Sequence, residues 1–101
     1  MKDSCRKYLE EQFGGDEVVA EIYREYVASA REKLSEAEGE LAAGEWVRLD
    51  RTAHAVKGNA LSVGDQEMAD AAVALRKAAA LNDAWECAAQ LARMRELSAA
   101  L

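Results

Sequence analysis

The chain has 101 residues, of which 50% are hydrophobic and 32% charged, and its formal net charge is −6. This length fits one domain over residues 1–101, and the negative charge argues against nonspecific binding to nucleic acid or to an anionic membrane. The chain contains no proline, and its apolar residues are rich in alanine and leucine. These are the best apolar helix formers, so the composition favours an all-α protein.

Glycines and short polar clusters divide the chain into five predicted helices. They cover about residues 3–13, 16–43, 45–63, 66–81 and 84–101. Asp16, Asp65 and Asp83 are placed to cap three of them, and Asp83 has capping-box spacing to Glu86. The four longer segments carry apolar residues at spacings of three and four. We therefore expect an up-down-up-down four-helix bundle, with the short additional N-terminal helix lying across one end.

The sequence also limits where the protein works. No apolar run approaches the roughly 18 residues that a membrane span needs, and the N-terminus lacks the apolar core of a signal peptide. Two cysteines, Cys5 and Cys87, are too few for a metal site or a disulfide framework. We expect reduced, buried thiols in a cytoplasmic protein, although the sequence leaves a bridge between them open. The initiating Met1 and the compact length favour a free-standing protein.

The single histidine, His54, lies in the predicted helix 45–63. The apolar stripe of that helix consists of Trp46, Leu49, Ala53, Val56, Ala60 and Val63. At 100° per residue, His54 lies roughly 130° from the centre of this stripe. The imidazole is therefore predicted to face away from the core.

The residues around His54 suggest that another macromolecule reaches it. Gly58 lies on the same side one turn later, although an interior helical glycine costs roughly 0.5–1 kcal/mol relative to alanine. Access to the imidazole would explain that cost. Val47 and Leu61 lie seven residues before and after His54 and share its face with Arg51. Two apolar residues that bracket an exposed histidine indicate a docking surface for a partner.

This arrangement suits a nucleophile. An imidazole of ordinary pKa, about 6.5, is mostly neutral at pH 7 and has a lone pair on one nitrogen. If it accepts a phosphoryl group, Lys57 can offset the added charge, and Arg51 contributes to the local positive field. Asp50, one turn before His54, is either an orienting acceptor for the other ring nitrogen or an ordinary solvated aspartate.

The segment His54–Ala60 (HAVKGNA), with Gly64 ten residues after the histidine, resembles the signature of histidine-containing phosphotransfer (HPt) domains. The segments Tyr8–Gly14 (YLEEQFG) and Ala42–Trp46 (AAGEW) and the Leu75-containing helix agree with this, so the resemblance covers nearly the whole chain.

The resemblance implies a four-helix bundle with a surface phosphoacceptor, which is the Nε2 nitrogen of His54. It implies that Lys57 contacts the phosphoryl group and that Gly58 leaves room for the partner. Asn59 stands where the family most often has serine, a departure that keeps a small polar residue. The implied partner is a response-regulator receiver domain, a hybrid histidine kinase, or both.

The chain has no Gly-rich nucleotide loop and no carboxylate cluster suited to Mg²⁺. The expected protein is thus a phosphoryl carrier and not an enzyme, binds no cofactor itself, and depends on the receiver for the aspartate and Mg²⁺. One alternative is a non-transferring helical interaction module in which His54 is an ordinary surface residue. An enzyme with His54 as general base lacks a catalytic partner beyond Asp50, and a metal site would have one histidine and distant cysteines.

Overall fold

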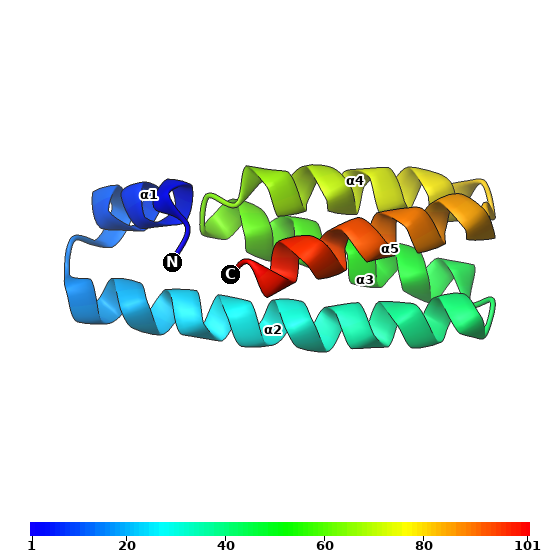
Figure 1. The fold of residues 1–101 in the computed structure, drawn as a ribbon, viewed down its shortest axis with the longest axis horizontal. Helices are drawn as coiled ribbons and strands as arrows, with labels where there is room; N and C mark the ends of the chain where they lie inside the picture. The colour runs from blue at the N-terminus through cyan, green and yellow to red at the C-terminus, as the bar shows by residue number, and fades with distance from the viewer.

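The computed structural model describes residues 1–101 and contains only helices (Figure 1). They are α1 (Asp3–Phe13), α2 (Asp16–Ala42), α3 (Trp46–Ser62), α4 (Gln66–Ala80) and α5 (Ala84–Ala99). The prediction of an all-α protein is confirmed, and each predicted boundary lies within two residues of the observed one. None of the five helices combines the length and the apolarity that a bilayer crossing requires.

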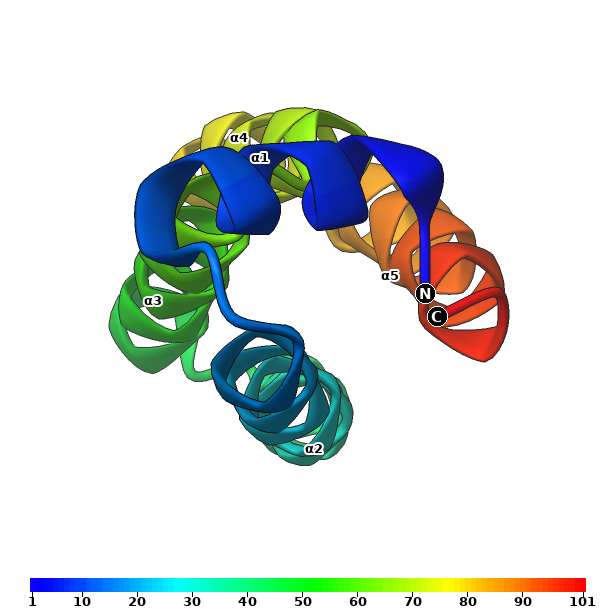
Figure 2. The same cartoon turned by 90° about the vertical axis from the view of Figure 1, so that its left-hand side faces the viewer.

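Helices α2 to α5 lie side by side, and the chain reverses direction at each short turn (Figure 1). Each packs on the next in sequence, most extensively α3 on α4, and α5 packs back on α2. The backbones of the diagonal pairs α2–α4 and α3–α5 stay more than 8 Å apart between Cα atoms. Viewed along its length, the molecule shows these helices arranged around a common centre (Figure 2).

Helix α1 covers the part of α2 that extends past the other helices. Because α2 has 27 residues, it is about 40 Å long at 1.5 Å per residue. In Figure 1, α1 runs beside the N-terminal end of α2, beyond the start of α4. It buries Cys5 and Leu9 completely. Both cysteines of the chain are buried and free, so no bridge joins Cys5 to Cys87.

Alanines make the contact between α3 and α4 close. The core is one cluster of 23 buried residues drawn from all five helices and the α3–α4 turn. On α3 it includes Ala53 and Ala60, and on α4 it includes Ala69, Ala72 and Ala79. Side chains of this size let two helix backbones approach closely. Long side chains at the edges of this contact therefore reach across from one helix to the other.

A buried aspartate ties three parts of the fold together. Asp65, only 1% exposed, caps α4 by accepting a hydrogen bond from the backbone N–H of Met68 (3.3 Å). Its carboxylate also accepts from the Tyr26 hydroxyl (2.6 Å) and from the Lys2 ammonium (2.7 Å). Burial, followed by this bond to Asp65, raises the pKa of Tyr26. The predicted cap at Asp65 is confirmed, and it also anchors α2 and the N-terminus.

Of the other two predicted caps, the one at Asp83 is confirmed and the one at Asp16 is not. Asp83 accepts from the backbone N–H of Glu86 (3.0 Å) and caps α5. Glu86 does not complete the box, because its carboxylate accepts from Gln90 instead (2.8 Å). The prediction of a cap at Asp16 is wrong. Gly15 occupies that position, and Asp16 begins the helix, where its charge favours the positive end of the helix dipole.

Candidate functional site

His54 lies on α3 and is exposed, as the helical wheel predicts. The residues that turn α3 toward the core are Leu49, Ala53, Val56 and Ala60, each at most 2% exposed. The backbone of α3 is therefore held by packing on one side while the imidazole stands on the other. The imidazole is therefore attached to a rigid backbone and is accessible to another molecule.

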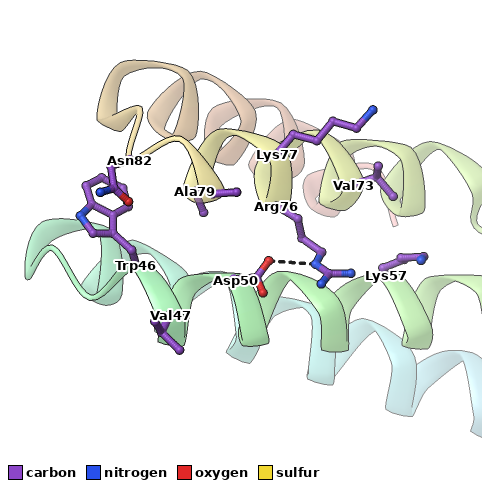
Figure 3. Close-up of a pocket in the computed structure, with 10 residues that line it drawn as sticks. Trp46, Val47, Asp50, Lys57, Val73, Arg76, Lys77, Ala79 and Asn82 are labelled. Atoms are coloured by element: carbon purple, nitrogen blue, oxygen red, sulfur yellow. Dashed lines mark hydrogen bonds and ion pairs between the residues drawn. The ribbon is translucent and has the colours of Figure 1, made fainter.

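An arginine from α4, which the helical pattern of α3 does not indicate, contacts the imidazole. The Nη1 atom of Arg76 lies 3.0 Å from Nδ1 of His54. The Nε–H of the same guanidinium donates to Asp50 Oδ1 at 2.9 Å, and this bond is the main reason that the pKa of Arg76 is raised. Figure 3 shows Arg76 reaching from α4 toward α3, where it lies between Asp50 and Lys57.

Asp50 takes neither of the two roles that the sequence left open, because it neither bonds the imidazole nor stands unpaired in solvent. Its carboxylate is engaged by Arg76, and it makes no hydrogen bond to the imidazole. The guanidinium offers several donors in a fixed geometry, so it bonds Asp50 with one and the ring with another. Any influence of Asp50 on the orientation of His54 therefore passes through Arg76. The Nε2 atom of the ring makes no hydrogen bond and is left for an incoming group.

Two of the cations near His54 are unpaired. Arg48 forms an ion pair with Glu45 (3.6 Å), and Arg76 is bound to Asp50. Arg51, which is exposed, and Lys57, which is half-buried, have no ion-pair or hydrogen-bond partner. Lys57 lies one turn after His54, so its ammonium is available to a negatively charged group on the imidazole.

Gly58 is exposed beside His54, and nothing in the fold requires a glycine there. A Cβ atom built at this position would meet no atom within 4 Å. The backbone is helical, so the cost of glycine is not offset by an unusual conformation. Open space in front of the helix is consistent with approach by a second macromolecule.

The two apolar residues on the His54 face are exposed, Val47 at 67% and Leu61 at 43%. Val47 also lies at the edge of a groove of about 610 Å³ between α3 and α4 (Figure 3). The residues that line it are Trp46, Val47, Asp50, Lys57, Val73, Arg76, Lys77, Ala79, Ala80 and Asn82. The groove joins an apolar end near Trp46 to the cations beside His54.

Asn59 contributes to packing. Its side-chain amide donates to the Ser29 hydroxyl at 3.2 Å, which links α3 to α2. It lies half-buried on the side of α3 away from α4, so it does not crowd the imidazole. No three His, Cys, Asp or Glu side chains in the chain lie close enough together to hold a metal ion.

Comparison with known proteins gives one match. A family model described as the Hpt domain matches residues 21–101, which contain most of α2 and all of α3, α4 and α5. The matched region includes every site residue described above. Neither the curated proteins nor the solved structures give a significant match to the chain.

Proposed function

We propose, because this chain belongs to the Hpt domain family, that His54 carries a phosphoryl group to or from the aspartate of a response-regulator receiver domain. The family points to a phosphotransfer module of two-component signalling. The observation that carries the assignment to His54 is its exposed imidazole, with Nε2 unbonded and the unpaired Lys57 one turn away. A hybrid histidine kinase is the other proposed partner, and the cytoplasm is the proposed location.

The proposed step is a direct displacement at phosphorus. With the ring proton on Nδ1, the Nε2 lone pair attacks the phosphorus of an aspartyl phosphate and a P–N bond forms. The Nδ1 proton then leaves to solvent, so the phosphorylated ring is neutral. The P–O bond to the aspartate breaks, and the carboxylate retains its electron pair. Transfer in the other direction reverses these changes. This chain supplies the nucleophile, the nearby cation and an up-down helical platform that holds both.

The partner supplies what this chain lacks. Mg²⁺ is expected on the receiver, where it neutralises phosphoryl oxygens. Val47, Arg51 and Leu61 are proposed to contact the receiver, because they share the exposed face of His54. The protein is thus a phosphoryl carrier, and the complete reaction site forms only in the complex.

Phosphoryl transfer from phosphorylated receivers tests this function. The protein is mixed with ³²P-labelled receivers of the source organism and Mg²⁺, separated on a gel, and treated with acid or alkali. The proposal predicts label on this chain that acid removes and alkali does not, as for a P–N bond. A receiver that binds the chain without transferring label would favour the interaction module and contradict the proposal.

Removal of the Lys57 charge is expected to destabilise the phosphorylated state. In Lys57→Gln, the equilibrium between phosphorylated receiver and phosphorylated His54 should shift toward the receiver about three- to tenfold, because the phosphoryl group loses a partly desolvated cation. Binding of the unphosphorylated receiver should change less than about twofold. Arg48→Gln is the matched control, since that cation is already paired with Glu45. Equal losses of transfer and binding would contradict the role of Lys57.

A bulky side chain at position 58 is expected to block the partner without harming the fold. Gly58→Leu should raise the free energy of unfolding by roughly 0.5–1 kcal/mol, because leucine favours the helix and meets open space. The rate of transfer should nevertheless fall at least tenfold. Gly39→Leu on α2 is the control: it removes the same helical penalty, also into open space, and should leave transfer unchanged. An unchanged rate in Gly58→Leu would refute the steric explanation.

A further inference from the structure

The contact between Arg76 and His54 constrains the position of the imidazole proton. A guanidinium carries only donors and stays charged at any pH relevant to proteins. Its Nη1 lies 3.0 Å from Nδ1 of His54, so Nδ1 must offer the lone pair in this contact. The proton of the neutral ring is then on Nε2. A neutral ring in this contact therefore has its proposed nucleophilic nitrogen in the protonated form, which does not attack phosphorus.

The geometry of the guanidinium is fixed by Asp50. The bond from Arg76 Nε to Asp50 Oδ1 (2.9 Å) occupies one edge of the group and directs Nη1 toward the ring. The side chains of Arg76 and Asp50 are 35% and 39% exposed, so solvent reaches this ion pair. Its arrangement depends on the geometry of the two groups more than on burial. Asp50, Arg76 and His54 thus form a chain of contacts that ends at Nδ1.

We propose that Arg76 is a positioning residue that holds the lone pair of His54 on Nδ1 and so protects the phosphoryl group after it has been accepted on Nε2. The second half of this statement rests on the proposed function. A neutral ring phosphorylated on Nε2 also carries its lone pair on Nδ1, so Arg76 can donate to it as in the free protein. The same contact suits the resting and the phosphorylated states. For attack, Nε2 gives its proton to solvent and Nδ1 takes one up, so the contact with Arg76 breaks during transfer and forms again when Nδ1 loses that proton.

The protection follows from how a P–N bond is hydrolysed. When Nδ1 gains a proton, a water oxygen bonds to phosphorus and the P–N electron pair returns to Nε2. The products are a neutral imidazole with its proton on Nδ1 and inorganic phosphate, which keeps both protons of the water. Without that proton the leaving group is an anionic imidazolate, which is much poorer. Arg76 occupies the lone pair of Nδ1, so a proton reaches Nδ1 only after the contact between Arg76 and the ring breaks.

The other charged groups around the ring do not occupy Nδ1. Besides Arg76, the charged side chains on this side of α3 and α4 are Asp50, Arg51, Lys57 and Lys77. From α2, Glu40 packs against α3, but its carboxylate accepts from the Thr52 hydroxyl (2.6 Å). No Cα atom of α1 or α5 lies within 8 Å of one in α3. Only Arg76 forms a hydrogen bond with the imidazole.

The position of the proton can be measured without any phosphorylation. Long-range ¹H–¹⁵N correlation spectra at alkaline pH distinguish a protonated ring nitrogen from an unprotonated one. For the wild-type protein we expect an unprotonated Nδ1 and a protonated Nε2. In Arg76→Ala the population with the proton on Nδ1 should rise, and in Lys77→Ala, which removes the same charge from the same helix, it should not. Identical spectra for wild type and Arg76→Ala would overturn the proposal even where transfer occurs.

The lifetime of the phosphorylated protein tests the second half of the proposal, which is that Arg76 protects the phosphoryl group. Wild type, Arg76→Ala and Lys77→Ala are labelled, and loss of phosphate is followed from pH 5 to pH 9. Since Arg76 blocks access of a proton to Nδ1, its removal should speed the acid-promoted loss of phosphate. Near neutral pH the lifetime should fall about two- to tenfold, which corresponds to one exposed charged hydrogen bond. Lys77→Ala should keep the wild-type profile.

The outcomes separate this inference from the proposed function. Coincident pH profiles in proteins that all accept phosphate would refute protection by Arg76 and leave phosphoryl transfer intact. Failure of wild-type protein to accept phosphate from any donor would refute the proposed function and, with it, the protective role. The proton position in the unphosphorylated ring would still decide whether Arg76 holds the lone pair on Nδ1.

Discussion

Replacement of His54 by glutamine is expected to abolish phosphoryl acceptance, with a loss of at least about a thousandfold relative to wild type. Glutamine is close in size and polar, but its amide nitrogen has no lone pair available for attack on phosphorus. The measurement is transfer of ³²P from a phosphorylated receiver in the presence of Mg²⁺.

The same variant separates a carrier from a docking module. Because His54 is exposed and takes no part in the core, the free energy of unfolding of His54→Gln should stay within about 0.5 kcal/mol of wild type. Its affinity for the receiver should also change little. Retained transfer in this folded variant would mean that another residue accepts the phosphoryl group, and the assignment to His54 would be wrong.

Gly64→Ala is expected to lower the free energy of unfolding by about 3 kcal/mol. Gly64 has φ +73°, a backbone conformation that costs alanine roughly 1–2 kcal/mol. A Cβ atom there would lie 2.6 Å from the Cβ and 2.8 Å from the Cγ of Tyr8, so α1 itself would have to move, at about 1–3 kcal/mol. For a domain of this size, the midpoint of thermal unfolding should fall by roughly 10–20 °C.

A second glycine serves as the control for this prediction. Gly58→Ala adds the same methyl group in open space on a helical backbone, so it should raise the free energy of unfolding by roughly 0.5–1 kcal/mol. The two variants should therefore move thermal stability in opposite directions. Equal small effects at both positions would show that α1 does not pack against the α3–α4 turn as described.

The helices could be predicted because their signals are local. Apolar spacing, glycine at the turns and aspartate at two helix starts fix the five segments, and the structure agrees within two residues. Asp16 shows the limit of this reasoning. An acidic residue stabilises either the cap position or the first turn of a helix, and the sequence does not distinguish the two. The anchoring of Lys2 by Asp65 joins residues 63 positions apart, and no local pattern indicates it.

The site was predictable on α3 and not across to α4. The exposure of His54, Gly58, Val47 and Leu61 follows from one helical wheel. Arg76 belongs to another helix, and there the sequence gives only an arginine beside the buried Leu75. The sequence did indicate the position of Arg76 through the register of the α3–α4 hairpin.

In two antiparallel helices, residues equally distant from the turn lie opposite each other. His54 precedes Gly64 by ten residues, and Arg76 follows it by twelve. That register places the two side chains at about the same level. It does not specify which nitrogen of the ring the guanidinium contacts, and this depends on the rotamers that Asp50 and the packing of α3 on α4 select.

The most direct test is to locate phosphorus on the ring itself. Uniformly ¹⁵N-labelled protein is phosphorylated by a receiver with Mg²⁺ and examined by ¹⁵N and ³¹P NMR for one-bond coupling between the two nuclei. We predict a single phosphorus nucleus, coupled to Nε2 of His54. Phosphorus on any other atom, or an unmodified His54 in a protein that has taken up phosphate, would contradict this structure-based assignment.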